Sequence, residues 1–306
     1  MKAVVFGYQE IGSVCLEELL AFGVQVSCLF THEDDPREEI WFRRPVAIAK
    51  KHDIPVYTPE TLKDEKWIKL IKEAAPDFIF SFYYRNMIPK GILDIARIAA
   101  LNLHGSLLPK FRGRAPVNWV LATGESETGI TLHEMVEKPD AGDIVAQKKV
   151  EIAFDDDVYT LYMKMTEAAR QLMKETLPKL AGGSFVRIPQ TGVSSYFGGR
   201  KPEDGLISWQ QDATTLYNLV RAVTHPYPGA FTRLGRKKLF IWKAFPEDDS
   251  GNTQPGKIVS IHPLMVSTGK GLLKLLRVQR EGEEEMDADV FASVNNIENE
   301  ILGGSA

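Results

Sequence analysis

An asparagine and a histidine two positions apart, Asn102 and His104, are the residues of this 306-residue chain best suited to chemistry. They end an apolar run that begins at Ile98. In a β-strand, residues i and i+2 point to the same face, so the carboxamide and the imidazole would lie side by side. An imidazole can exchange a proton near neutral pH, and an amide N–H can donate to a developing oxyanion. The pair therefore has the local composition of an active site.

No nucleophilic side chain accompanies this pair. Cys15 and Cys28 lie on other elements, and Ser106 lacks the context of a nucleophile elbow. We therefore expect direct attack by a group of the substrate rather than a covalent intermediate. A third residue should orient the imidazole and favour its protonated form. The best candidate is Asp140, in a turn after the expected strand 128–135.

Basic residues follow the pair in the loop after His104. We expect either Arg112 or Arg114 to bind an anionic group, since a guanidinium suits carboxylate and phosphate; the alternative is that both are solvated surface charges. His133 alternates with apolar residues along its expected strand, and we interpret it as structural.

The first half of the chain alternates strand-like and helix-like segments. The apolar patterns predict strands at 2–7, 24–30, 77–83, 128–135 and 144–152, and helices near 11–22, 67–74, 92–98 and 157–181. This alternation predicts a doubly wound, mostly parallel α/β sheet with helices on both faces. Such sheets bind ligands at the carboxyl ends of their strands, where Asn102 and His104 lie. Gly7 and Gly12 do not form a G-x-G-x-x-G pattern, so NAD binding is not expected.

The second half of the chain predicts a smaller β-domain. A helix-like segment at 216–223 is stopped by the proline-rich run 225–229, and short strand-like segments follow from about 230 to 280. We expect a catalytic domain at residues 1–203 and a small β-barrel domain at residues 204–306.

Composition limits the function classes. The formal net charge is −4, which does not favour general nucleic-acid binding. The two cysteines carry no metal-ligand spacing, so neither a metal site nor a disulfide framework is expected. We see no signal-peptide pattern and no apolar stretch long enough for a bilayer. These features predict a cytoplasmic protein without metal or membrane partner.

The run from Asn102 to Pro109, taken with Asp140, resembles the formyltransferases that use 10-formyltetrahydrofolate. The resemblance covers nearly the whole chain. It implies a Rossmann-like N-terminal formyltransferase domain and an OB-like β-barrel after residue 230. It also implies that Asn102, His104 and Asp140 are catalytic and that 10-formyltetrahydrofolate is the formyl donor.

The same resemblance implies a folate site and an acceptor. The implied folate contacts are Asn86, Met87, Ile88, Arg114, Val136, Glu137, Lys138, Pro139 and Asp140. Segments 81–85, 104–119 and 128–133 are most similar to the branch that N-formylates UDP-4-amino-4-deoxy-L-arabinose, for lipid A and lipopolysaccharide modification and polymyxin resistance. That branch is fused to a dehydrogenase/decarboxylase, which this sequence does not contain. A stand-alone enzyme, a homo-oligomer and a domain of a fusion protein all stay open.

Three alternatives also stay open. A methionyl-tRNA formyltransferase would share the chemistry, but residues 33–45 are net acidic, a poor match for tRNA phosphates. The basic residues that oppose the acidic ones there are Arg37, Arg43 and Arg44. A formyltransferase for another dTDP- or GDP-linked amino sugar is the second alternative. A folate- or nucleotide-binding regulator is the third, although a binding module has no need of a proton shuttle.

Overall fold

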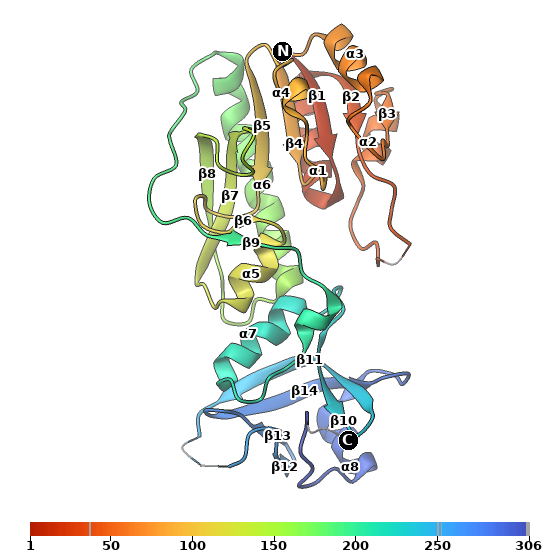
Figure 1. Ribbon diagram of the computed structural model, residues 1–306, viewed down its shortest axis with the longest axis vertical. Coiled ribbons are helices and arrows are strands. Elements are labelled where there is room, and N and C mark those ends of the chain that lie inside the picture. Colours follow the sequence, from red (N-terminus) through yellow and green to blue (C-terminus); the bar gives the residue numbers. More distant parts are fainter. Residues whose placement is uncertain (37, 250, 252, 304–306) are drawn as a thin grey trace. The chain divides into compact units, whose positions relative to one another are not determined.

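A computed structural model describes residues 1–36, 38–249, 251 and 253–303 (Figure 1). Arg37 of the acidic loop and the last three residues lie outside the described residues. The chain divides into two compact units. The N-terminal unit comprises residues 1–116, 127–152 and 162–198, and the C-terminal unit comprises residues 117–126, 153–161 and those from 199 onward. The predicted boundary between residues 203 and 204 stays a prediction.

The N-terminal unit is built on a seven-stranded sheet of order β3-β2-β1-β4-β5-β7-β8. Its strands are β1 (Lys2–Gly7), β2 (Gln25–Phe30), β3 (Val56–Tyr57), β4 (Phe78–Phe82), β5 (Ala99–His104), β7 (Glu127–Glu134) and β8 (Ile144–Glu151). The first five are parallel, and β7 and β8 continue the sheet antiparallel. The predicted mostly parallel α/β sheet is therefore confirmed. A separate two-stranded sheet pairs β6 (Arg112–Gly113) with β9 (Tyr196–Phe197).

Helices follow the strands along the chain. They are α1 (Gln9–Ala21), α2 (Pro45–Lys51), α3 (Glu65–Ala74) and α4 (Lys90–Leu93); α5 (Pro116–Ala122) and α6 (Val158–Ala181) contain residues of both units. The helix predicted at 92–98 is wrong, because α4 ends at Leu93. The amides of Arg97 and Ile98 instead donate to the carbonyls of Pro76 and Asp77, which leads the chain into β5.

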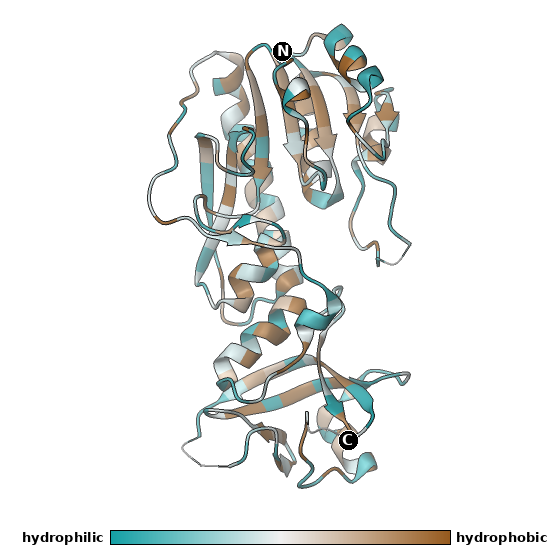
Figure 2. Cartoon of the chain, in the orientation of Figure 1, coloured by the Kyte–Doolittle hydropathy of each residue, from teal (hydrophilic) through white to brown (hydrophobic). Residues whose placement is uncertain are grey.

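The core of this unit lies on the central strands. Every residue of β4 is buried, and so are all but the first of β1, as expected for strands covered on both faces. Figure 2 shows the same strands as the most hydrophobic part of the unit. Cys15 and Cys28 are free thiols buried in this core, and burial raises the pKa of both, that of Cys28 to about 12.

The C-terminal unit contains an antiparallel sheet of order β10-β11-β14-β13-β12, with β15 paired to β14. Its strands are β10 (Ala230–Leu234), β11 (Lys237–Glu247), β12 (Ile258–Ile261), β13 (Leu264–Ser267), β14 (Leu272–Arg280) and β15 (Met286–Asp287). Its helices are the 3₁₀ turn η1 (Pro202–Gly205), α7 (Ala213–Val223) and α8 (Ala288–Asn295). The predicted β-domain is confirmed as an antiparallel sheet, and its closure into an OB-like barrel stays a prediction. Within the described part of the chain, no helix combines the length and apolarity that crossing a membrane requires.

Candidate active site

The site is built on the carboxyl end of β5. Leu101 and Leu103 are buried in packing, and Asn102 alternates with them, as the i and i+2 spacing predicts. β7 pairs antiparallel with this end of β5, so that Asn102 lies opposite His133 and His104 opposite Thr131. The pairing of β5 with β7 therefore brings His133 and Thr131 next to Asn102 and His104.

His104 is a buried neutral base. Its Nε2 lies 2.7 Å from the carbonyl oxygen of Phe111 and donates to it, since a carbonyl can only accept. Its Nδ1 lies 3.6 Å from Oδ1 of Asp140 and is left to accept a proton. Burial lowers the pKa of His104 below its usual 6.5, more than the Asp140 carboxylate raises it. The Asp140 carboxylate favours the protonated form, as expected, but the effect of burial on the pKa is larger.

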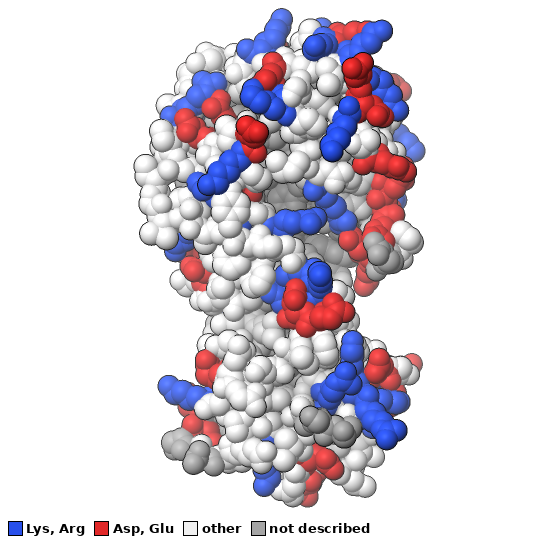
Figure 3. Space-filling model, viewed as in Figure 1, with Lys and Arg blue, Asp and Glu red and all other residues white. Residues whose placement is uncertain are grey.

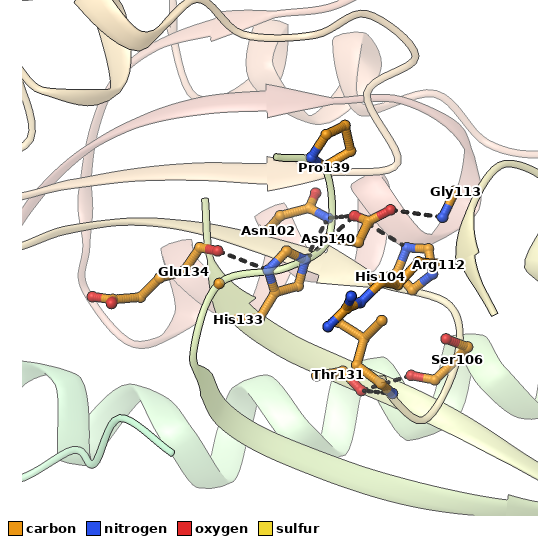
Figure 4. A network of polar contacts seen from close by, with 12 residues as sticks. Asn102, His104, Ser106, Arg112, Gly113, Thr131, His133, Glu134, Pro139 and Asp140 are labelled. Carbon is orange, nitrogen blue, oxygen red and sulfur yellow. Dashed lines mark hydrogen bonds and ion pairs between the residues drawn. The ribbon is translucent and has the colours of Figure 1, made fainter. Parts of the chain in front are cut away.

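Asp140 is an ionised carboxylate at the centre of the group (Figure 4). Its Oδ2 accepts from the backbone N–H of Gly113 at 2.9 Å, and its Oδ1 lies 3.5 Å from Nε2 of His133. Burial alone would raise the pKa of Asp140, but nearby His104 and the hydrogen bond from the Gly113 N–H lower it to about 2. The carboxylate is therefore placed to stabilise a proton on Nδ1 of His104.

His133 is a member of this group that the sequence reasoning missed. Its Nδ1 donates to the carbonyl of Glu134 at 2.8 Å, since a carbonyl can only accept, and its Nε2 accepts from the amide nitrogen Nδ2 of Asn102 at 3.1 Å. The other N–H of Asn102 points to Oδ1 of Asp140 at 3.5 Å, the long limit of a hydrogen bond. His133 thus orients the Asn102 amide and leaves one N–H weakly engaged. Only the long-range register of β5 and β7 could have revealed this contact.

The two arginines of the following loop are in different environments. The guanidinium of Arg112 is buried, and its Nε and Nη2 donate to Oε1 of Gln190 at 3.1 and 2.6 Å. Arg114 is exposed, and its guanidinium forms no ion pair with any residue that the structure describes. Of the two, Arg114 is therefore the one that a ligand anion could reach. Gln190 carried no signal in the sequence.

The segments named as folate contacts meet at one apolar cluster. Ile88 is buried in it, and Met135, which precedes the 136–140 segment, packs against the same cluster. Met87 is 62% exposed and Val136 43% exposed, so each of these two segments has an apolar side chain open to solvent. Asn86, Glu137, Lys138 and Pro139 are also exposed. Met87 and Val136 therefore provide exposed apolar surface, and Arg114 provides an exposed cation next to Gly113 in the chain.

No cluster of three or more His, Cys, Asp or Glu side chains suited to a metal ion occurs in the described ranges.

Family comparisons account for most of the chain. Residues 1–177 match the formyl transferase family, and residues 200–296 match the formyl transferase C-terminal domain. The chain belongs to the formyl transferase family. The enzyme class that the sequence predicts is therefore confirmed at the level of the family.

Several solved structures share the fold. The N-formyltransferase from Helicobacter canadensis, in complex with folinic acid and dTDP-3-aminofucose, is 19% identical with a TM-score of 0.67, covering 90% of this chain and 99% of that one. The methionyl-tRNA formyltransferase from Clostridium thermocellum is 18% identical with a TM-score of 0.55, covering 90% and 99%. HypX from Aquifex aeolicus is 20% identical with a TM-score of 0.63, covering 96% of this chain and 47% of HypX. The chain thus spans about half the length of HypX.

Proposed function

We propose that this protein transfers a formyl group from 10-formyltetrahydrofolate to the amino group of a nucleotide-linked amino sugar. The observation that carries the proposal is the group formed by Asn102, His104 and Asp140 at the end of β5. It combines an amide donor, a buried base whose Nδ1 is available, and a carboxylate that favours a proton on that base. Membership of the formyl transferase family supports this reading.

The proposed chemistry is direct attack by the neutral amine on the formyl carbon. A C–N bond forms to the amine, and the weakly engaged N–H of Asn102 stabilises the oxyanion that develops. Nδ1 of His104 takes the proton from the attacking nitrogen, and the Asp140 carboxylate stabilises the imidazolium. The bond from the formyl carbon to N10 then breaks, and His104 returns its proton to N10. The products are the N-formylated sugar and tetrahydrofolate.

The folate would lie against residues 86–88 and 136–140. The exposed side chains of Met87 and Val136 can pack against the flat faces of the pteridine ring, and Arg114 can pair with a glutamate carboxylate. In support, the Helicobacter canadensis relative was solved with folinic acid. No metal enters the proposed reaction.

We further propose UDP-4-amino-4-deoxy-L-arabinose as the acceptor, the substrate of the formyltransferase domain of the bifunctional polymyxin-resistance protein ArnA. The supporting features are sequence segments 81–85, 104–119 and 128–133, which resemble that domain. A role in lipid A modification, a cytoplasmic location, a homo-oligomer and fusion to a dehydrogenase/decarboxylase belong to the same proposal. A dTDP- or GDP-linked amino sugar is the competing acceptor, since dTDP-3-aminofucose is bound in the Helicobacter canadensis relative.

A tRNA acceptor is less well supported by the charges. Asp34 pairs with Arg44, and Glu38 pairs with Arg85, so basic side chains near the 33–45 loop are already neutralised. Figure 3 shows acidic side chains along the same side of the N-terminal unit. Phosphate contacts dominate affinity for nucleic acids, and this loop offers few.

The test is a reaction with 10-formyltetrahydrofolate and a panel of acceptors, followed by mass spectrometry. The panel holds UDP-, dTDP- and GDP-linked amino sugars and charged initiator tRNA. We expect a formyl group to be added to UDP-4-amino-4-deoxy-L-arabinose. Formylation of the tRNA alone would replace the sugar proposal, and tight folate binding without any formylated product would favour a binding protein.

A further inference from the structure

Gln190 joins the two loops that meet at the candidate active site. It lies in the extended segment 184–197, which follows α6. Its Nε2 donates to the carbonyls of Asp140 and Gly142 at 2.9 and 2.7 Å. Its Oε1 accepts from two nitrogens of Arg112, at 3.1 and 2.6 Å. One carboxamide therefore makes four hydrogen bonds and uses all its donor and acceptor capacity.

The same segment also places the N–H that Asp140 accepts. β9 pairs with β6, so that Gly113 lies opposite Phe197. Gly113 has a φ of +96°, and a Cβ there would lie 2.2 Å from the Phe197 oxygen. The close approach fixes the orientation of the Gly113 N–H, which donates to Oδ2 of Asp140. Segment 184–197 thus holds both the backbone of the Asp140 turn and the Gly113 N–H that the Asp140 carboxylate accepts.

The Asp140 turn needs such support. Asp140 has a φ of +52°, in the left-handed region, which is unfavourable for most residues with a Cβ. A strained backbone conformation persists only where its surroundings determine it. The buried Arg112 guanidinium also needs acceptors, and Gln190 supplies one for two of its nitrogens.

We propose that Gln190 is a positioning residue for Asp140. It holds the backbone of the turn at Asp140 and Gly142 against the fixed guanidinium of Arg112, and so keeps the carboxylate beside Nδ1 of His104. The inference rests on the proposed function, in which Asp140 stabilises the protonated His104. Gln190 itself touches neither substrate nor the transferred group.

The kinetic test compares Gln190→Leu and Gln190→Glu with Val193→Ala, a control at an 87% exposed position of the same segment. Gln190→Glu keeps the acceptor for Arg112 but loses both donors. We expect both variants to lower kcat about 10²-fold, the effect of a misplaced catalytic group, with little change in KM for the folate. In an Asp140→Asn background, Gln190→Leu should cause no further loss, because both changes remove the same contribution. Additive losses would overturn the positioning role.

A second measurement does not depend on catalysis. Amide hydrogen exchange should show loss of protection at Gly113 in Gln190→Leu and Gln190→Glu, with β4 and β5 unchanged. Unchanged protection at Gly113 in folded variants overturns the proposal. If the wild-type protein formylates no acceptor, the proposed function fails while the exchange result still decides the role of Gln190. If transfer is normal in both variants, the positioning proposal alone fails.

Discussion

Two groups of polar side chains follow strands of the same sheet and differ in their access to water. The first surrounds Asp140, which lies within 3.6 Å of His104 and 3.5 Å of His133, both buried. The second follows β4, where Arg85 pairs with Glu38; these side chains are 32% and 42% exposed. Charges interact strongly away from water and weakly where solvent screens them. The comparison predicts that substitutions in the buried group have larger effects than substitutions in the exposed pair.

The largest expected effect comes from removing the base. His104→Ala should lower kcat on the order of 10²–10⁴-fold, because general base catalysis is lost. Asp140→Ala should also lose most transfer activity, since the imidazolium loses its carboxylate. Initial rates with 10-formyltetrahydrofolate and the accepted sugar measure both.

The control for these variants is His52→Ala, a substitution at an exposed position after α2. Thermal melting should show that His104→Ala and Asp140→Ala remain folded. A wild-type rate in either variant would remove that residue from the mechanism.

A smaller loss is expected at His133. His133→Leu removes the acceptor of the partly buried Asn102 amide and leaves one of its N–H groups without that partner, at a cost of up to roughly 1–3 kcal/mol. We expect kcat to fall by about 10- to 100-fold, which is that cost expressed as a rate. His133→Gln supplies an acceptor oxygen and should recover part of the rate. Equal rates in the two variants would show that His133 acts only through packing.

The pH dependence follows from the pKa directions in the buried group. Transfer needs neutral His104, whose pKa lies below 6.5, so kcat/KM should stay level from pH 8 to about 6.5 and fall in more acidic solution. Stability should change in the same direction. The unfolded chain binds more protons than the folded one below pH 6.5 at His104, and between pH 3.8 and about 2 at Asp140.

These two curves are measured by initial rates and by urea unfolding at each pH. The free energy of unfolding should decrease as the pH falls below 6.5, because of His104, and again between pH 3.8 and about 2, because of Asp140. An acidic limb centred above pH 7 would contradict the neutral, buried base. His104→Ala should remove the stability change below pH 6.5 that His104 contributes.

The smallest effect is expected in the exposed pair. Glu38→Gln removes the partner of Arg85, yet the free energy of unfolding should change by less than about 1 kcal/mol. Urea unfolding measures it, with Glu73→Gln on the exposed face of α3 as the matched control. If Glu38→Gln lowers the free energy of unfolding several times more than Glu73→Gln does, then the exposed Arg85–Glu38 pair is closer in strength to the buried group around Asp140 than its exposure indicates.

The sequence predicts most of the N-terminal sheet because its strands are buried, apolar and separated by helical patterns. It fails at residues 92–98, where apolar spacing resembles a helix. There the hydrogen bonds of Arg97 and Ile98 to Pro76 and Asp77 decide the structure. Such bonds join segments about 20 residues apart and leave no local signal.

The sequence predicts those site residues that lie on a single strand. Asn102 and His104 follow from the period of a strand, and Asp140 from a turn and from the family resemblance. His133 requires the register between β5 and β7, and Gln190 requires the path of segment 184–197. The lowered pKa of His104 follows from the burial of its ring, which the spacing of residues does not predict.

The two buried cysteines have a practical consequence. Cys15 lies in α1 and Cys28 in β2, and a thiol must reach solvent and lose its proton before it reacts. Both are inaccessible and have raised pKa values in the folded state. The rate at which a thiol reagent labels them therefore reports how often the N-terminal sheet opens, which gives the protein a built-in probe of its own unfolding.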